Sequence, residues 1–149
     1  MVSSICIEGQ RIASGSWDES CEIWSIVEKT KLYKVEHNSS VNHTQLFPDG
    51  SNFDLITSSR DQTVKVWKGG KLKQTLKHSN YCYTFQLDSK KQKLAVAYSG
   101  GVTIGSTAGW KLIADKKVGE IMDLCFNEDS NKILAAEILG DIYVIDLHE

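Results

Sequence analysis

The chain consists of short apolar-rich runs separated by turn-forming residues. The first strand of each expected unit falls at 2–7, 41–47, 82–87 and 121–126. Polar turns such as Pro48-Asp49-Gly50-Ser51 and Asn127-Glu128-Asp129-Ser130 follow these runs, and such residues supply turn geometry. No segment shows a helical period over about 11 residues. The pattern therefore predicts an all-β chain.

Further strands follow each of these runs in the same order. Second strands are expected at 11–16, 54–59, 94–98 and 133–137. Third strands end at Trp24, Trp67, Gly105 and Ile145. Fourth strands are expected at 31–36, 72–77 and 111–116. We therefore expect four-stranded antiparallel sheets, with the last one lacking its outer strand.

One motif occurs twice with little change, at 12–24 and 55–67. Each copy has a strand rich in small residues, an aspartate in a tight turn, and a tryptophan six residues after that aspartate. A period of about 40 residues is typical of a repeat architecture. The period predicts approximate repeats at 1–38, 39–79, 80–119 and 120–149, and the third and fourth copies have lost the aspartate and the tryptophan.

These motifs resemble WD40 repeats. The resemblance rests on Ser14-Gly15-Ser16-Trp17-Asp18 with Trp24, on Ser58-Ser59-Arg60-Asp61 with Trp67, and on His78-Ser79-Asn80-Tyr81. It implies a single β-propeller domain over residues 1–149, with about four blades and an incomplete ring. The chain departs from the family's Gly-His dipeptide, because Glu36 precedes His37 and Lys77 precedes His78.

In this family, a histidine, a strand hydroxyl, the turn aspartate and the tryptophan form a hydrogen-bonded stack inside a blade. In repeat two the resemblance assigns His37, Asp61, Trp67 and the hydroxyl of Thr57 or Ser59 to this stack. Repeat one retains Asp18, Trp24 and Ser14 or Ser16, but its histidine would precede Met1. Repeat three retains His78. We expect these residues to have a structural role.

The resemblance also implies a partner-binding face, formed by the start of each inner strand and by the residue before each turn aspartate. Aromatic and arginine side chains dominate binding hot spots in protein interfaces. The candidate binding residues on this face are Trp17, Arg60, Tyr81, Tyr83 and Tyr98. For the tyrosines, the alternative is that one or two fold back into the blade.

The bulk composition is that of an ordinary soluble globular protein. The 149 residues are 41% hydrophobic and 24% charged, with a net charge of −2. No run of about 18 apolar residues predicts a membrane span, and the N-terminal residues lack a secretory pattern. The cysteines form no C-x-x-C pair, which favours reduced, buried thiols. We expect an intracellular protein, cytoplasmic or nuclear, with no cofactor.

Three catalytic or ligand-binding alternatives have weaker support. Ser59, His37 and Asp61 have the residue types of a hydrolase triad, but the group recurs with the repeat and lacks the context of a nucleophile. The lysines near residues 65–77 suggest nucleic-acid binding, which the net charge disfavours. The histidines and cysteines lack metal-ligand spacing. We therefore expect a protein that is not an enzyme and holds no metal.

The resemblance implies a scaffold or adaptor that presents a rigid face to a protein or peptide partner. The alternative is the substrate-receptor part of a ubiquitin ligase, because the short turn at 8–11 resembles F-box WD40 receptors. WD40 rings usually hold seven or eight blades. We therefore expect either a fragment or short isoform of a longer propeller, or self-association of two copies to complete a ring.

Overall fold

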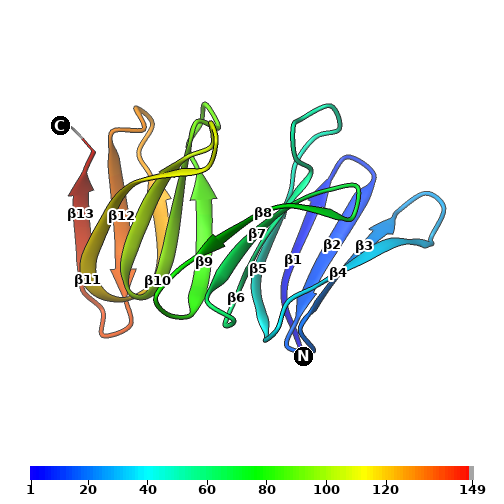
Figure 1. Cartoon of the computed structure of the whole chain (residues 1–149), viewed down its shortest axis with the longest axis horizontal. Helices are drawn as coiled ribbons and strands as arrows, with labels where there is room; N and C mark the ends of the chain where they lie inside the picture. Colours follow the sequence, from blue (N-terminus) through cyan, green and yellow to red (C-terminus); the bar gives the residue numbers. More distant parts are fainter. Residues whose placement is uncertain (148–149) are drawn as a thin grey trace. The chain divides into compact units, whose positions relative to one another are not determined.

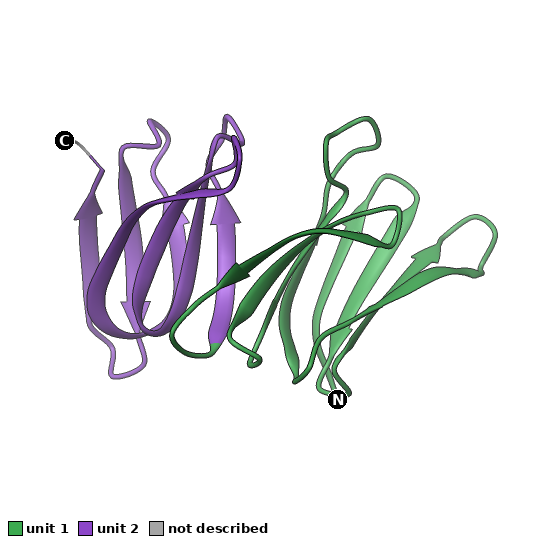
Figure 2. Cartoon of the chain, in the orientation of Figure 1, with its two compact units in different colours: residues 1–81 green, residues 82–149 purple. Residues whose placement is uncertain are grey.

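The chain folds entirely into antiparallel sheet. In a computed structural model that describes residues 1–147, these residues form thirteen β-strands and no helix (Figure 1). The strands belong to two compact units, Met1–Tyr81 and Cys82–Glu149 (Figure 2). The prediction of an all-β fold made of antiparallel sheets is confirmed. The assignment of all four repeats to one domain stays a prediction.

Unit 1 contains two four-stranded sheets that correspond to the first two repeats. The first has the order β1 (Val2–Glu8), β2 (Arg11–Ser16), β3 (Ser20–Ser25) and β4 (Lys31–Glu36). The second has the order β5 (Val41–Leu46), β6 (Leu55–Ser59), β7 (Thr63–Lys68) and β8 (Lys71–Lys77). Each strand pairs with its neighbour in sequence, as in a meander.

Unit 2 has one continuous hydrogen-bonded order of five strands, which divides into two sheets that share the long strand Lys111–Phe126. Its order is β13 (Ile142–Asp146), β12 (Lys132–Glu137), β11 (Lys111–Phe126), β10 (Lys93–Ser106) and β9 (Cys82–Leu87). The first half of β11 pairs with β10, and its second half pairs with β12. The expected fourth strand of repeat three and first strand of repeat four are thus one continuous element, bent near Gly119, whose φ is +109°.

Strand β10 contains both the second and the third expected strands of repeat three. The residues that flank its two ends lie side by side, as the backbone N–H of Thr107 donates to the carbonyl of Gln92 at 2.9 Å. The element therefore doubles back near Gly100, whose φ of +125° favours glycine. A Cβ on Gly101 would lie 2.1 Å from the carbonyl oxygen of Lys116. Glycine at these positions allows a tight reversal beside another strand.

The same register irregularity recurs in all four repeats, where the inner strand meets the second strand. The register shifts after Val2, Val41, Cys82 and Ile121, which pair with Ser16, Ser59, Tyr98 and Glu137. A β-bulge of this kind bends a strand and increases its twist. Because the bulge recurs, it defines which residues of different repeats are structurally equivalent. Tyr98 is equivalent to Ser59.

Packing between the two sheets of unit 1 is close enough to require a glycine. Ala13, Cys21, Ile23 and Val35 of the first sheet share one core with Leu46, Leu55 and Trp67 of the second. A Cβ added to Gly15 would lie 2.7 Å from Cγ2 of Thr44 and 2.8 Å from Cγ1 of Val41. This core positions the second repeat's polar residues, which are described below.

The cysteines differ in exposure. Cys21 and Cys82 are buried, as expected, and burial raises the pKa of the Cys21 thiol to about 12. Cys6 is half-buried. Cys125 is exposed, so the expectation of four buried thiols is wrong at this position. Within residues 1–147 no helix has the length and apolarity needed to cross a membrane.

Candidate functional site

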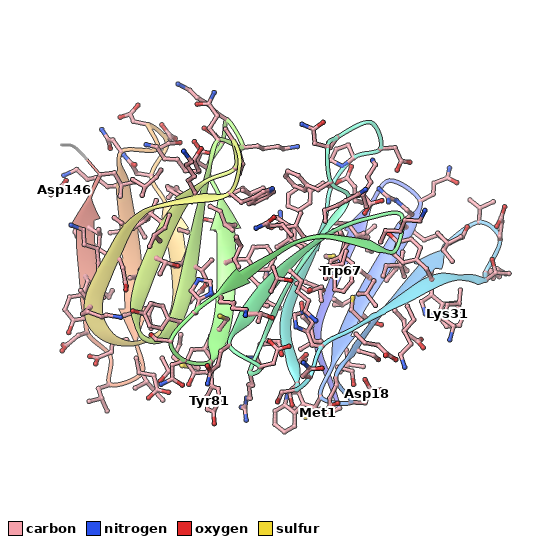
Figure 3. The ribbon with its side chains drawn as sticks, in the orientation of Figure 1. Met1, Asp18, Lys31, Trp67, Tyr81 and Asp146 are labelled. Carbon is pink, nitrogen blue, oxygen red and sulfur yellow. The ribbon has the colours of Figure 1, made fainter. Side chains whose placement is uncertain are left out.

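Repeat two contains a buried stack of hydrogen-bonded polar side chains. The Nδ1 atom of His37 lies 2.8 Å from Oδ2 of Asp61, and its Nε2 atom lies 2.7 Å from Oγ1 of Thr57. The indole Nε1–H of Trp67 donates to the same hydroxyl oxygen at 2.9 Å. His37 precedes β5, Thr57 lies on β6, and Trp67 lies on β7, so the stack connects three parts of unit 1. Figure 3 shows Trp67 inside this unit.

The directions of these hydrogen bonds follow from the groups' chemistry. The indole can only donate, so the hydroxyl of Thr57 accepts from Trp67 and donates to Nε2 of His37. The neutral imidazole then donates from Nδ1 to Asp61. The Thr63 hydroxyl also donates to Oδ1 of Asp61 at 2.6 Å. Every side-chain polar group in this hydrogen-bonded stack therefore has a partner, which avoids a desolvation penalty of about 1–3 kcal/mol per group.

The pKa values of the pair reflect this environment. Burial lowers the pKa of His37, against the opposing attraction of the Asp61 carboxylate, so the imidazole is neutral. Burial alone would raise the pKa of Asp61. Hydrogen bonds from His37, from Thr63 and from the backbone N–H of Asn38 outweigh burial and hold this pKa well below its usual range. Asp61 is therefore a fixed negative charge that orients a neutral histidine.

Ser59 has another role than the one expected from the resemblance. Its hydroxyl donates to the carbonyl of Ser39 at 3.1 Å and accepts from the backbone N–H of Asp61 at 3.0 Å. Thr57 supplies the hydroxyl of the stack. His37 uses Nε2 for Thr57, so Ser59, His37 and Asp61 do not form a hydrolase triad.

Repeat one retains the turn but not the stack. Asp18 accepts from the backbone N–H and the hydroxyl of Ser20, at 3.1 and 2.6 Å. The side chain of Trp24 is exposed, and its Nε1 lies 3.2 Å from Oε2 of Glu22. The expected structural role of Trp24 inside a stack is therefore wrong. The physical reason is that Trp24 lies with Ile5 and Ile7 on the exposed face of the first sheet, whereas the equivalent Trp67 packs in the core shared by the two sheets.

His37 and His78 make equivalent backbone hydrogen bonds. The backbone N–H of His37 donates to Glu19, and that of His78 donates to Gln62, both at 2.8 Å. Both acceptor residues have positive φ, 72° and 69°. In repeat three, Val96 and Gly105 occupy the positions of Thr57 and Trp67. The structural role of His78 stays a prediction.

Two candidate binding residues contact each other at one end of unit 1. The guanidinium carbon of Arg60 lies 5.3 Å from the centre of the Trp17 ring, a cation–π geometry. Both residues are exposed, and 46% of Trp17 is accessible to solvent. Each lies in the turn between the second and third strands of its sheet.

Backbone contacts hold both turns against the start of an inner strand. The N–H of Trp17 donates to the carbonyl of Met1 at 2.9 Å, and that of Arg60 donates to Ser40 at 3.0 Å. The Ser40 hydroxyl also contacts the carbonyl of Trp17 at 3.4 Å, which links the two sheets. Met1 and the turn residue Asp18 lie at the same end of the first sheet (Figure 3). We call Met1, Trp17, Ser40 and Arg60 the turn surface.

The three candidate tyrosines differ from one another. Tyr81 is exposed and ends unit 1, and Tyr83 is half-buried with its hydroxyl bonded to the carboxylate of Glu120. Tyr98 is buried, and its hydroxyl donates to Oδ1 of Asp115 at 2.7 Å. The expected exposure of Tyr98 is therefore wrong, because the structural register makes it equivalent to Ser59 and not to Arg60. A single face that contains all five candidates stays a prediction.

The sequence interpretation missed two exposed apolar residues, Met1 and Ile138. Met1 forms part of the turn surface, and Ile138 occupies in repeat four the position of Trp17 and Arg60. The N–H of Ile138 donates to Glu120, just as that of Arg60 donates to Ser40. Ile138 was missed because repeat four lacks the turn aspartate that marks this position in repeats one and two. The regular spacing of the repeats could have identified the position.

Two lysines of the expected basic patch are engaged within unit 1. Lys65 donates to the carbonyl of Glu36 at 3.0 Å, and Lys68 donates to that of Ser51 at 2.9 Å. The ammonium of Lys65 also lies 5.7 Å from the Trp67 ring centre. In the part of the chain that the structure describes, no group of three His, Cys, Asp or Glu side chains could hold a metal ion.

Comparison with known proteins agrees with this geometry. The WD40 family (WD domain, G-beta repeat) matches residues 2–25 and 29–68, which lie in the two sheets of unit 1. The structure is similar to the crystal structure of the computationally designed Ika4 protein, with a TM-score of 0.83. The match covers 99% of this chain and 92% of that one at 20% identity, so it shows the fold alone.

Two natural relatives show similarity over most of the chain. The U3 small nucleolar RNA-associated protein 15 homolog of Gallus gallus is 30% identical over 93% of this chain. The small ribosomal subunit protein RACK1 of Drosophila melanogaster is 30% identical over 74% of it. The chain spans 27% and 33% of the lengths of these two proteins. Together with the repeated turns and the stack in repeat two, these matches show that the chain is a WD40-repeat protein with a partial β-propeller.

Proposed function

We propose that this chain is an interaction scaffold that binds a protein or peptide partner through the turn surface. WD40 repeats support a role in protein interaction, and the relatives are named as ribosomal or RNA-associated proteins. The observation that carries the proposal is the exposed contact between Trp17 and Arg60. By analogy with the relatives, we place the protein inside the cell, in the cytoplasm or the nucleus.

The turn surface has the properties of a binding hot spot. Trp17 offers a large apolar ring, and Arg60 offers several N–H donors above that ring. Packing of the core does not explain these side chains, because both are exposed. The backbone of both turns is held by hydrogen bonds to Met1 and Ser40, so little conformational entropy is lost when a partner binds.

A pulldown from cell extract with the full chain tests the proposal. The wild type is compared with Trp17→Ala and Arg60→Ala, and with Lys31→Ala as the control. Lys31 is exposed and pairs with Glu22 on β3, away from the turns. We expect each turn-surface variant to weaken capture of the same protein by about 30-fold, which corresponds to about 2 kcal/mol.

A parallel pulldown after RNase treatment separates a protein partner from indirect capture through RNA. Capture that survives the nuclease and is lost in both variants supports the proposal. Capture that both variants retain would show that the turn surface is not the binding site. Capture that disappears with the nuclease would show binding through RNA.

A further inference from the structure

The two sheets of unit 1 show how one repeat covers the next. The face of a sheet that points to the preceding repeat is called here its leading face, and the opposite one its trailing face. The leading face of the second sheet consists of buried residues, Val41, Thr44, Leu46, Leu55 and Trp67. It packs on the trailing face of the first sheet, formed by Cys6, Ala13, Gly15, Cys21 and Ile23.

Unit 2 repeats this arrangement with different side chains. The trailing face of repeat three consists of Ala95, Ala97, Val102 and Ile104. It shares a core with the leading face of repeat four, which consists of Ile121, Leu124, Ile133 and Ile145. All eight side chains are buried. Leading faces therefore meet trailing faces in both units.

The leading face of repeat one has no such cover among the described residues. By register, Ile5 and Ile7 are equivalent to Thr44 and Leu46, because they pair with Ser14 and Ile12 as Thr44 and Leu46 pair with Thr57 and Leu55. Ile5 is 68% exposed and Ile7 is 64% exposed. Trp24, equivalent to the buried Trp67, is also exposed. The side chains of a leading face are thus present, and no sheet formed by residues 1–147 covers them.

The trailing face of repeat four is uncovered in the same sense. Ile142 and Val144 are equivalent to Cys21 and Ile23, which are fully buried. Ile142 is 70% exposed and Val144 is 57% exposed. Leu134, equivalent to the buried Ala13, is exposed as well, and it lines a hollow with Cys125 and Ile142.

We propose that two copies of this chain associate head to tail, with the trailing face of repeat four of one copy on the leading face of repeat one of the other. One chain carries both halves of a contact that it already makes once in each unit. Repeat units of this kind bury their apolar faces only against neighbouring units. Because the contact joins two different faces, it is heterologous, and each copy offers both of the faces that take part in it.

The first test is the molar mass of the full chain, measured by light scattering over a wide range of protein concentrations. We expect a mass of about twice the 16.6 kDa of one chain. Ile7→Glu on the leading face or Ile142→Lys on the trailing face should each reduce the mass to that of one chain. Val27→Glu is the matched control, because Val27 is exposed in the turn between β3 and β4 and lies on neither face.

Mixing the two variants tests the head-to-tail geometry. The Ile7→Glu copy has an intact trailing face and the Ile142→Lys copy has an intact leading face, so the mixture should form a heterodimer. A symmetric contact between like faces would instead leave one of the two variants dimeric by itself, which would overturn the proposal. A wild type that stays monomeric at every concentration would also overturn it.

Alkylation of Cys125 provides a readout that does not depend on mass. Cys125 lies on the trailing face of repeat four and is exposed in a single chain. We expect its alkylation rate to fall as the wild-type concentration rises, and to remain constant for Ile7→Glu, which keeps Cys125 and its surroundings unchanged. A rate that is independent of wild-type concentration would contradict the proposed contact.

Discussion

His37 and Asp61 are 24 positions apart in sequence, yet Nδ1 of the histidine lies 2.8 Å from Oδ2 of the aspartate. The histidine precedes the second sheet, and the aspartate lies in the turn between β6 and β7. Their hydrogen bond therefore joins the segment before β5 to the turn between β6 and β7, and Thr57 extends the stack to Trp67.

The pair predicts that acid destabilises the protein. The pKa of His37 is lowered in the folded state, so the unfolded chain binds a proton more readily. The stabilisation is complete above the ordinary histidine pKa of 6.5 and is lost as the pH falls through the folded-state pKa. Asp61 adds stability above its ordinary pKa of 3.8 that is lost at lower pH. We expect the thermal unfolding midpoint to decrease below about pH 6.5.

Thermal unfolding of His37→Gln provides the comparison. Glutamine can hydrogen-bond but does not titrate, so the pH dependence between about 6.5 and 4.5 should become shallower. An unchanged slope in His37→Gln would mean that another group is responsible.

Thr57→Val should destabilise the protein more than Thr57→Ser. Valine keeps the volume but removes the hydroxyl that joins His37 and Trp67, which leaves both ring nitrogens without this partner. We expect a loss of about 1–3 kcal/mol in the free energy of unfolding, measured by urea denaturation. Serine keeps the hydroxyl and removes one methyl group. A valine variant as stable as the wild type would contradict the role assigned to the hydroxyl.

Trp67→Ala and Trp17→Ala should separate stability from binding. Trp67 is 5% exposed, and its loss leaves a cavity in the core of unit 1, so we expect about 3–5 kcal/mol of destabilisation. Trp17 is exposed in a turn, and its replacement should change stability by about 0.5 kcal/mol or less. Denaturation curves of both variants check this prediction. Equal destabilisation by both would contradict the different burial of the two rings.

Gly15→Ala should destabilise the protein by overpacking. The added Cβ would lie 2.7 Å from Cγ2 of Thr44 and 2.8 Å from Cγ1 of Val41. We expect a loss of about 1–3 kcal/mol in the free energy of unfolding. Thr44→Ser removes one of the clashing carbons and retains the hydroxyl, so the double variant should be more stable than the sum of the single effects predicts. Additive effects would mean that the two sheets are not in close contact here.

The sequence predicted the repeated unit because its signals are local. An aspartate in a tight turn and a tryptophan six positions later recur within one strand pair, and this pattern is visible without knowledge of packing. The alternatives that the sequence left open concern packing. Thr57 and Ser59 lie on the same face of β6, and only the position of the imidazole ring selects Thr57.

Sequence alone thus determined the repeat and the strand positions of unit 1, because strand and turn preferences act between near neighbours, and the resemblance to WD40 repeats identified His37, Asp61 and Trp67. The tertiary structure decided that Tyr98 is buried, because the register places it opposite Cys82. It also decided that Trp24 is exposed while the equivalent Trp67 is buried. Burial depends on which sheet lies against a residue, and that contact is made by strands far away in the chain.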